Sequence, residues 1–205
     1  MSGKYYFRQR NLILIRSKTE LREKYLRRRQ EFSLREVENS SKRIFENFRD
    51  RFPVEAGDKV HLFLSTAKFN EVQTGLFREY FREKGVRIFV PKIVDGAMIS
   101  VEINDASEMK ISKWGIEEPV SNLNAGITDY RYVITPLLYC DPAGNRVGYG
   151  KGYYDGFFSE IDSDCQKIGV SFFAPFEYIS DIFPHDVALD YLVLTDKILS
   201  FRGLL

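Results

Sequence analysis

The sequence predicts one α/β domain of three layers, in which helices cover both faces of a largely parallel sheet. Short apolar segments alternate along the chain with amphipathic helical segments, and this alternation is typical of parallel strands joined by helices. No internal repeat or low-complexity linker interrupts the series. The 205 residues, of which 44% are hydrophobic, are enough to bury one sizeable core and lie near the upper range of a single domain.

The first half of the chain supplies the first helices and strands and a hairpin. These are predicted helices over residues 17–30 and 33–51, a strand over 59–64, a helix over 71–83, a strand over 86–90 and a hairpin over 92–103. Ser33 and Glu36 stand at the spacing of a capping box, which marks the start of the second helix. Gly85 ends the third helix, and Asp95 with Gly96 predicts the tight turn of the hairpin.

The second half of the chain continues the alternation around a glycine-rich segment. Residues 132–135 are a predicted strand, which leads past Pro136 into that segment. A helix is expected over 152–161, followed by strands over 168–172 and 191–194. The glycine-rich segment therefore precedes the N-terminus of a helix, which is a favourable place for an anion.

Cysteine content and hydropathy argue against secreted and membrane proteins. Cys140 and Cys165 cannot form a disulfide framework and lie at no metal-ligand spacing, which favours a reducing, cytoplasmic location. No apolar run approaches the roughly 18 residues of a membrane span, and the apolar run 12–15 is flanked by basic residues. We therefore expect neither a membrane span nor a secretory signal.

The charge of the chain is unevenly distributed. Residues 1–51 hold 15 of the 30 Lys and Arg but only 7 of the 29 Asp and Glu. One interpretation is a nucleic-acid-binding face centred on Arg27, Arg28 and Arg29. The interpretation that we favour is two amphipathic helices with solvated cations on their outer face. A third is a surface that steers anionic ligands toward the protein.

Residues 144–155 have the composition of a phosphate-binding turn. Glycines at 148, 150 and 152 can adopt positive φ and let backbone N–H groups approach an anion. The segment is not a Walker loop, because Asn145 and Gly152 stand where that loop needs a glycine and a hydroxyl. It is not a dinucleotide fingerprint either, because its glycines follow a strict spacing of two.

Charged and aromatic residues accompany these glycines. Arg146 and Lys151 would add positive charge beside the same anion, and Asp155 suits a magnesium ion that travels with phosphates. A merely flexible turn would explain the glycines, but not these charges together with Tyr153 and Tyr154. We therefore interpret the segment as a loop that binds a phosphorylated ligand.

The same twelve residues resemble the signature of the 5-formyltetrahydrofolate cyclo-ligase family, also called methenyltetrahydrofolate synthetases. The family pattern G-x-R-[LIV]-G-x-G-x-G-Y-Y-D is filled at every fixed position. Shorter segments at 18–22, 71–74, 115–119 and 186–190 resemble the family's K-x-x-L-R, E-x-x-T, G-I-x-E-P and D-x-x-x-D in the same order. The resemblance implies a cyclo-ligase domain over residues 17–205 after an extension over 1–16. It also implies a fold shared with ribose-phosphate isomerase-like and CoA-transferase-like domains.

The activity that the resemblance implies is the ATP- and Mg²⁺-dependent cyclisation of 5-formyltetrahydrofolate to 5,10-methenyltetrahydrofolate, with release of ADP and phosphate. ATP is needed because the formyl oxygen is a poor leaving group until it is phosphorylated. The protein's task is then to position the reactants and to neutralise charge. The implied partners are ATP and the folate, with or without a polyglutamate tail. We expect a monomer that binds neither nucleic acid nor membrane.

Site residues follow from the resemblance by position. The implied nucleotide-binding residues are Lys18, Arg22, Arg146, Val147, Gly148, Tyr149, Gly150, Lys151, Gly152, Tyr153 and Tyr154. The implied folate contacts are Leu64, Glu71, Tyr149, Gly150, Lys151, Gly152 and Tyr153. Arg146 and Lys151 are the implied catalytic residues, and Asp155 and Asp186 are the implied magnesium ligands.

Each of these roles has a structural alternative. Lys18 and Arg22 lie four apart on one helix face and could be an ordinary basic surface. Glu71 could be a carboxylate favoured by a helix N-terminus, and Tyr154 could be a core residue. Asp190 is expected to be structural. The alternative functions are another ATP-dependent phosphoryl-transfer enzyme, a relative acting on a sugar phosphate, and a basic RNA- or protein-binding domain.

Overall fold

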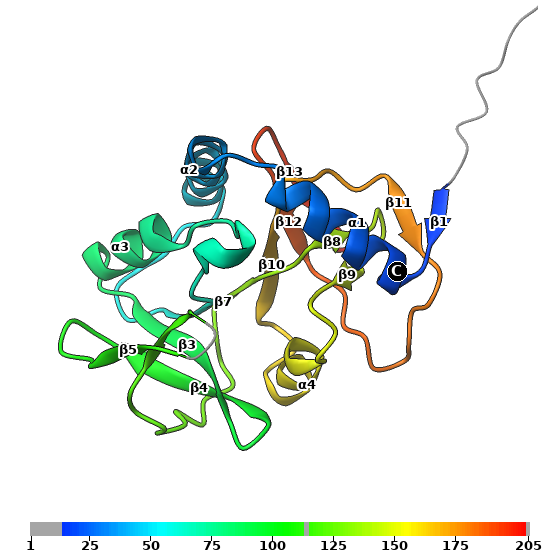
Figure 1. Cartoon of the computed structure of the whole chain (residues 1–205). Coiled ribbons are helices and arrows are strands. Elements are labelled where there is room, and N and C mark those ends of the chain that lie inside the picture. Colours follow the sequence, from blue (N-terminus) through cyan, green and yellow to red (C-terminus); the bar gives the residue numbers. More distant parts are fainter. Residues whose placement is uncertain (1–13, 113–114, 204–205) are drawn as a thin grey trace, which may run out of the picture.

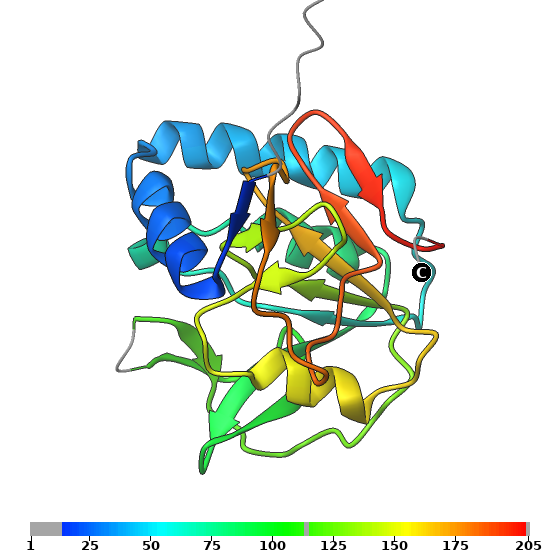
Figure 2. The same ribbon diagram turned by 90° about the vertical axis from the view of Figure 1, so that its right-hand side faces the viewer.

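The computed structural model describes residues 14–112 and 115–203, and within them an α/β domain is built around one large sheet (Figures 1 and 2). The helices of this part of the chain are α1 (Lys18–Gln30), α2 (Leu34–Arg51), α3 (Gly75–Glu83) and α4 (Tyr153–Glu160), with a short 3₁₀ turn η1 (Ala67–Phe69). In Figure 2 the sheet lies between α2 and α4. This arrangement confirms the predicted α/β class and the cover on both faces. No helix among the described residues has the length and apolar character needed to cross a membrane.

The main sheet has the strand order β13-β12-β10-β7-β2-β3-β4. Its strands are β2 (Lys59–Leu62), β3 (Arg87–Val94), β4 (Ala97–Ile103), β7 (Tyr132–Thr135), β10 (Gln166–Val170), β12 (Tyr191–Val193) and β13 (Ile198–Ser200). The five central strands are parallel and the two edge strands are antiparallel. From β2 the chain continues to β3 and β4 on one side of the sheet, and from β7 it continues to β10, β12 and β13 on the other. The carboxyl ends of β2 and β7 therefore form a topological switch point, where ligands of such sheets bind.

Three pairs of short strands complete the fold. They are β1 (Leu14–Arg16) with β11 (Glu177–Ile179), β5 (Met109–Ile111) with β6 (Glu117–Pro119), and β8 (Tyr139–Cys140) with β9 (Arg146–Val147). None of these pairs is predicted from the sequence, because strands of two or three residues carry little periodicity. Residues 14–16, which we assigned to an extension, pair with β11. Residues 1–13 of that extension lie outside the described residues.

The two faces of the sheet bury different helices. On one face, Val60 and Leu62 of β2 pack with α2 and α3, in a cluster that includes Phe48 and Phe77. On the other face, Phe89 and Val133 pack against the aromatic side of α4. Successive side chains of a strand point to opposite faces, so β2 sends His61 toward α4.

Local signals placed several elements correctly. The capping box of Ser33 and Glu36 is formed, and the hairpin of β3 and β4 turns at Asp95 and Gly96, with φ of 50° and 82°. Both values are positive, as a two-residue turn between twisted strands requires. A second capping box, between Ser17 and Glu20, opens α1.

The expected boundaries around residues 63–75 were wrong. Strand β2 ends at Leu62 rather than at residue 64, and α3 begins at Gly75 rather than at residue 71. The chain between them is held by other bonds, because Thr66 caps η1 and Asn70 turns in the left-handed region with φ of 47°. Glu71 therefore lies in a buried loop, and its alternative role as a helix N-terminal acid is wrong. The last central strands also differ slightly, since β10 covers 166–170 and β12 covers 191–193.

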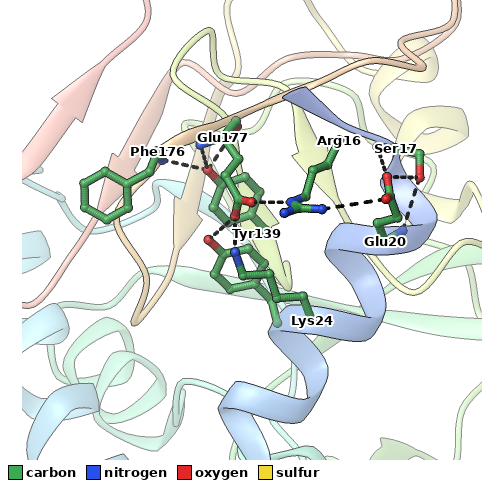
Figure 3. Close-up of polar contacts among 8 residues, drawn as sticks. Arg16, Ser17, Glu20, Lys24, Tyr139, Phe176 and Glu177 are labelled. Carbon is green, nitrogen blue, oxygen red and sulfur yellow. Dashed lines mark hydrogen bonds and ion pairs between the residues drawn. The ribbon is translucent and has the colours of Figure 1, made fainter. Parts of the chain in front are cut away.

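The carboxylate of Glu177 joins the N-terminal elements to the body of the protein (Figure 3). Its side chain is only 2% exposed and accepts hydrogen bonds from Arg16 at 2.8 Å, Lys24 at 2.7 Å and the Tyr25 hydroxyl at 2.8 Å. Burial raises the pKa of Glu177, but these three donors outweigh burial and leave its pKa below the ordinary value. The ionised carboxylate thus fixes β1 and α1 against β11.

Because His61 is buried, we expect the folding stability of the protein to fall in acid. The ring is fully buried among aromatic side chains, neither ring nitrogen has a partner within the described chain, and burial lowers its pKa to about 3. The pKa of an unfolded histidine is near 6.5. Between pH 6.5 and about 3, this side chain is therefore protonated in the unfolded state and neutral in the folded state. Stability therefore falls as pH decreases through this window, by about 1.4 kcal/mol per pH unit.

The His61→Phe variant should lose this sensitivity. Urea unfolding at pH 7 and pH 5 should show about 2 kcal/mol less acid destabilisation in the variant than in the wild type. His185→Phe is the matched control, because His185 is exposed. If the free energy of unfolding fell equally between pH 7 and pH 5 in His61→Phe and in wild type, His61 would not be the source of the acid sensitivity.

Candidate active site

A narrow hollow lies at the carboxyl ends of the central strands, beside the switch point. Phe63 follows β2, Pro136 follows β7 and Ser171 follows β10, and all three line the hollow. Two charged residues, Arg29 from α1 and Glu71 from the loop after β2, complete its polar part. Both are buried, with exposed fractions of 4% and 7%. Buried charges are costly unless they are paired, so their presence together indicates a site rather than a simple core.

Glu71 is held in one orientation by two donors. The Thr66 backbone N–H donates to one carboxylate oxygen at 2.9 Å, and the Tyr149 hydroxyl donates to the other at 2.7 Å. Burial raises the pKa of Glu71, and these two bonds offset burial only in part. The structure thus brings Glu71 to the glycine-rich segment, 78 residues further along the chain. Leu64 is half-buried and packs against the core beneath α2 and α3.

Arg29 was not among the expected site residues. Its guanidinium donates to the Leu137 carbonyl at 3.2 Å and to the Tyr149 hydroxyl, while its Nε is buried with no partner among the described residues. Arg29 does not lie among the solvated cations of the outer face that we favoured for this basic region, nor on the alternative nucleic-acid face, because its side chain is buried. Helical spacing was the available signal, since Leu21, Tyr25 and Arg29 follow each other at intervals of four and all are buried.

The glycine-rich segment is shaped around Arg22. The Arg22 Nε donates to the Gly148 carbonyl at 3.0 Å. Gly150 has φ of 83°, and a Cβ placed on it would lie 3.2 Å from the Arg22 guanidinium carbon. Gly152 also has a positive φ, of 70°, at the start of α4. Lys151 between them is exposed and has no ion pair in the described part of the chain, so its charge is available to a ligand.

Arg146 anchors the segment instead of facing an open surface. Its side chain is 6% exposed, pairs with Asp155 at 2.8 Å and donates to the Val187 carbonyl at 2.6 Å. Burial lowers the pKa of Arg146, although the charge of Asp155 acts in the opposite direction. The guanidinium also lies 4.7 Å from the centroid of the Phe158 ring. These contacts hold the loop against α4 and the segment near residue 187.

Asp186, like Asp155, is paired with a cation. Lys18 of α1 forms an ion pair with Asp186, and both side chains are 15% exposed. Burial raises the pKa of Asp186, but the bonds from Lys18 and from the Phe183 N–H outweigh it and lower the pKa overall. Asp155 accepts the N–H of the residue after Asp186, at 3.1 Å, so Asp155 lies beside the backbone of the segment that carries Asp186.

Asp155 and Asp186 are the candidate magnesium ligands, and their free carboxylate oxygens decide whether they could take such an ion. Among the described residues, the Asp155 Oδ2 and the Asp186 Oδ1 accept no hydrogen bond. No group of three or more candidate ligands occurs in this part of the chain. Magnesium is commonly bound by one or two carboxylates together with phosphate oxygens and water, which matches this donor set.

Several expected site residues belong to the core. Val147 is fully buried beside α1, which argues against a nucleotide contact by its side chain. Tyr154 packs its ring among the aromatic residues of the α4 face, and its buried hydroxyl has no partner within the described chain. Tyr153 is half-buried. Asp190 accepts the Lys167 N–H at 2.8 Å, which confirms its expected structural role.

The shape of the loop predicts different costs for two glycine substitutions. Gly150→Ala should lower the free energy of unfolding by about 1–2 kcal/mol, because alanine disfavours a left-handed backbone and its Cβ would press on Arg22. Gly148→Ala is the matched control, since that residue has no positive φ and open space around its Cβ. Urea denaturation of both variants tests this difference, and equal costs would contradict it.

Comparison with known proteins gives one consistent result. The family model described as the 5-formyltetrahydrofolate cyclo-ligase family matches residues 14–195. A probable 5-formyltetrahydrofolate cyclo-ligase of Caenorhabditis elegans is 26% identical over an alignment of 185 positions, which covers 82% of this chain and 88% of that protein. One from Schizosaccharomyces pombe is 30% identical over 109 residues, covering 51% of this chain and 53% of that protein.

Solved structures agree with these sequence matches. The 5,10-methenyltetrahydrofolate synthetase of Aquifex aeolicus superposes with a TM-score of 0.77 at 25% identity, covering 91% of this chain and 93% of that one. A synthetase from Mycoplasma pneumoniae has the same fold, with a TM-score of 0.68 at 21% identity over 88% of this chain and 100% of that one.

Proposed function

The chain belongs to the 5-formyltetrahydrofolate cyclo-ligase family, and from this premise we propose that it converts 5-formyltetrahydrofolate and ATP to 5,10-methenyltetrahydrofolate, ADP and phosphate. One observation carries the proposal. The glycine-rich loop bonds on one side to the cation Arg22 and on the other, through Tyr149, to the buried carboxylate Glu71. A single loop thus bonds both to a cation suited to phosphates and to a carboxylate at the hollow. The hollow has a volume of about 10 Å³, which is room for about one water molecule, so a ring is proposed to enter as the side chains around it move apart.

The proposed reaction needs positioning more than covalent chemistry. The formyl oxygen attacks the γ-phosphorus and ADP leaves, which gives an iminium phosphate. N10 of the folate then attacks the formyl carbon and loses its proton, and phosphate leaves as the methenyl bridge forms. Both steps are accelerated when the reacting atoms are held in line and the charge of the transferred group is neutralised.

The cations of the loop and of α1 are proposed to hold the phosphates. Lys151 is exposed and unpaired among the described residues, so it is the group that we assign to the transferring phosphate. Arg22 holds the loop by the Gly148 carbonyl and borders Gly150, and it is proposed to add charge there. Arg146 is proposed to act by holding the loop in shape, since its guanidinium is buried against Asp155.

Magnesium is proposed to bind at Asp155 and Asp186 together with the phosphates of ATP. The ion would supply charge neutralisation for the transferring phosphoryl group. Each carboxylate offers one oxygen that accepts no hydrogen bond within the described chain. Lys18 pairs with Asp186 in the structure and is proposed to stay beside the phosphates when the ion is bound.

The hollow beside Glu71 is proposed to hold the pterin ring. A carboxylate oxygen has more than one lone pair, so Glu71 can accept further N–H bonds besides those from Thr66 and Tyr149. Phe63, Phe172 and Phe173 supply apolar walls for the ring. A polyglutamate tail, a monomeric state and a cytoplasmic location stay predictions from the sequence.

The direct test is to mix the purified protein with 5-formyltetrahydrofolate, MgCl₂ and ATP and follow the near-ultraviolet absorbance of the methenyl product. We expect the absorbance to rise only when ATP is present and to stop when a chelator removes Mg²⁺. No rise from folded protein that still binds ATP would leave the nucleotide loop in place and reject the folate as substrate.

Lys151→Ala should lower ATP-dependent turnover by about 100-fold or more, because it removes a charge aimed at the transferring group. Folding should be unaffected, since the side chain is exposed and has no partner in the described part of the chain. Lys42→Ala, an exposed lysine on α2, is the matched control. Unchanged kinetics of Lys151→Ala in the same assay would remove this lysine from the phosphate role.

A further inference from the structure

We propose that Arg29 is a specificity-determining residue for the folate, which donates a hydrogen bond from its Nε to the oxygen at C4 of the pterin ring. The proposal rests on the proposed function, because it assumes that the hollow beside Glu71 receives the pterin.

The first observation is a buried donor without an acceptor. Arg29 is 4% exposed, and its Nε is closed off from solvent with no partner among the described residues. Its other two nitrogens each donate one hydrogen bond, to the Leu137 carbonyl and to the Tyr149 hydroxyl. A buried N–H of a charged group is rarely left unpaired, and each such case calls for an explanation such as a ligand or an ordered water.

The second observation is the direction of the hydrogen bonds around Tyr149. The Tyr149 hydroxyl has one proton, which it donates to Glu71 at 2.7 Å, so it accepts from Arg29. One hydroxyl therefore bridges a guanidinium and a carboxylate, and both of these line the same hollow. The bridge fixes the orientation of a donor and of an acceptor at one end of the hollow.

The third observation is the match between this pair and one edge of a pterin. That edge presents an amino group at C2, an N–H at N3 and a carbonyl oxygen at C4, in that order. Glu71 can accept from the two donors, and the oxygen beside them then needs a donor from the protein. Arg29 is the buried cation that lines the hollow next to Glu71. Its charge strengthens the bond, and its planar fork keeps the Nε in place while the other nitrogens are engaged.

This arrangement lets the site distinguish a 4-oxo pteridine from a ring that lacks a good acceptor at C4. A ring with a poor acceptor would leave the Arg29 Nε buried and unpaired, and sites built around such groups reject the analogue. Selectivity would then come from a residue outside the glycine-rich loop and outside the loop that carries Glu71.

The experiment compares two ligands that differ in one atom. Dissociation constants are measured by calorimetry, without ATP, for 5-formyltetrahydrofolate and for its 4-thioxo analogue, in which sulfur replaces the oxygen at C4. The thioxo group keeps the N3–H donor and is a weaker acceptor. The variants are wild type, Arg29→Met, Arg29→Lys and Arg27→Met, the last being an exposed control on the same helix.

We expect wild type and Arg27→Met to prefer the oxo compound by about tenfold, which is the size of one charge-assisted hydrogen bond. Arg29→Met should bind the oxo compound more weakly and show less than about twofold preference. Arg29→Lys should also lose the preference, because lysine has no Nε–H in the plane of a guanidinium. If the positive charge near Glu71 were the only requirement, Arg29→Lys would instead keep the preference.

Three results would overturn the proposal. These are a preserved preference in Arg29→Met, an equal weakening of both ligands in that variant, and restoration of the preference by lysine. Should Arg29→Met fail to fold, wild type alone decides, because equal affinity for the two ligands would refute the proposal. Failure of the proposed function gives a different result, since wild type would then bind neither ligand.

Discussion

The interaction on which the site depends is the docking of α1 by the buried carboxylate of Glu177. Helix α1 carries three cations that reach the glycine-rich loop or the segment beside it: Lys18, Arg22 and Arg29. Glu177 accepts from Lys24 and Tyr25 on that helix and from Arg16 just before it. A buried carboxylate with three donors is rigid, because any shift of the helix would leave charge unpaired away from water. The position of the cations is thus set by a residue outside the site.

The glycine-rich loop is held between two sets of bonds. Toward α1, Arg22 binds the Gly148 carbonyl and fills the space that a Cβ on Gly150 would need. Toward α4, Arg146 binds Asp155 and the Val187 carbonyl. The loop therefore needs glycine for close approach and two arginines for its shape. Lys151 is the cation left exposed on it, and it is therefore the residue of this loop that we propose to meet the ligand.

Among the described residues, the buried polar atoms without a hydrogen-bond partner include the ring nitrogens of His61 and the Nε of Arg29, which lie in different surroundings. His61 lies among the rings of Tyr130, Tyr154 and Phe157, and neither of its ring nitrogens has a hydrogen-bond partner within the described chain. Its neutral ring costs the protein stability in acid. The Arg29 Nε, in contrast, belongs to a side chain that lines a hollow beside a carboxylate. Local rules are most often broken at functional sites, and of these two groups only the Arg29 Nε lies in the candidate active site.

The sequence by itself determined the α/β class, the capping box at Ser33, the hairpin turn at Asp95 and the glycine-rich loop before α4, because each depends on residues a few positions apart. Only the tertiary structure decided that Glu71 meets Tyr149, that Arg29 turns inward, and that Arg146 is neutralised by its neighbour on α4. It also decided the pairing of β1 with β11, across more than 160 residues. Such contacts follow from how the strands cross in the sheet, and no local pattern of residues records which distant side chains that crossing brings together.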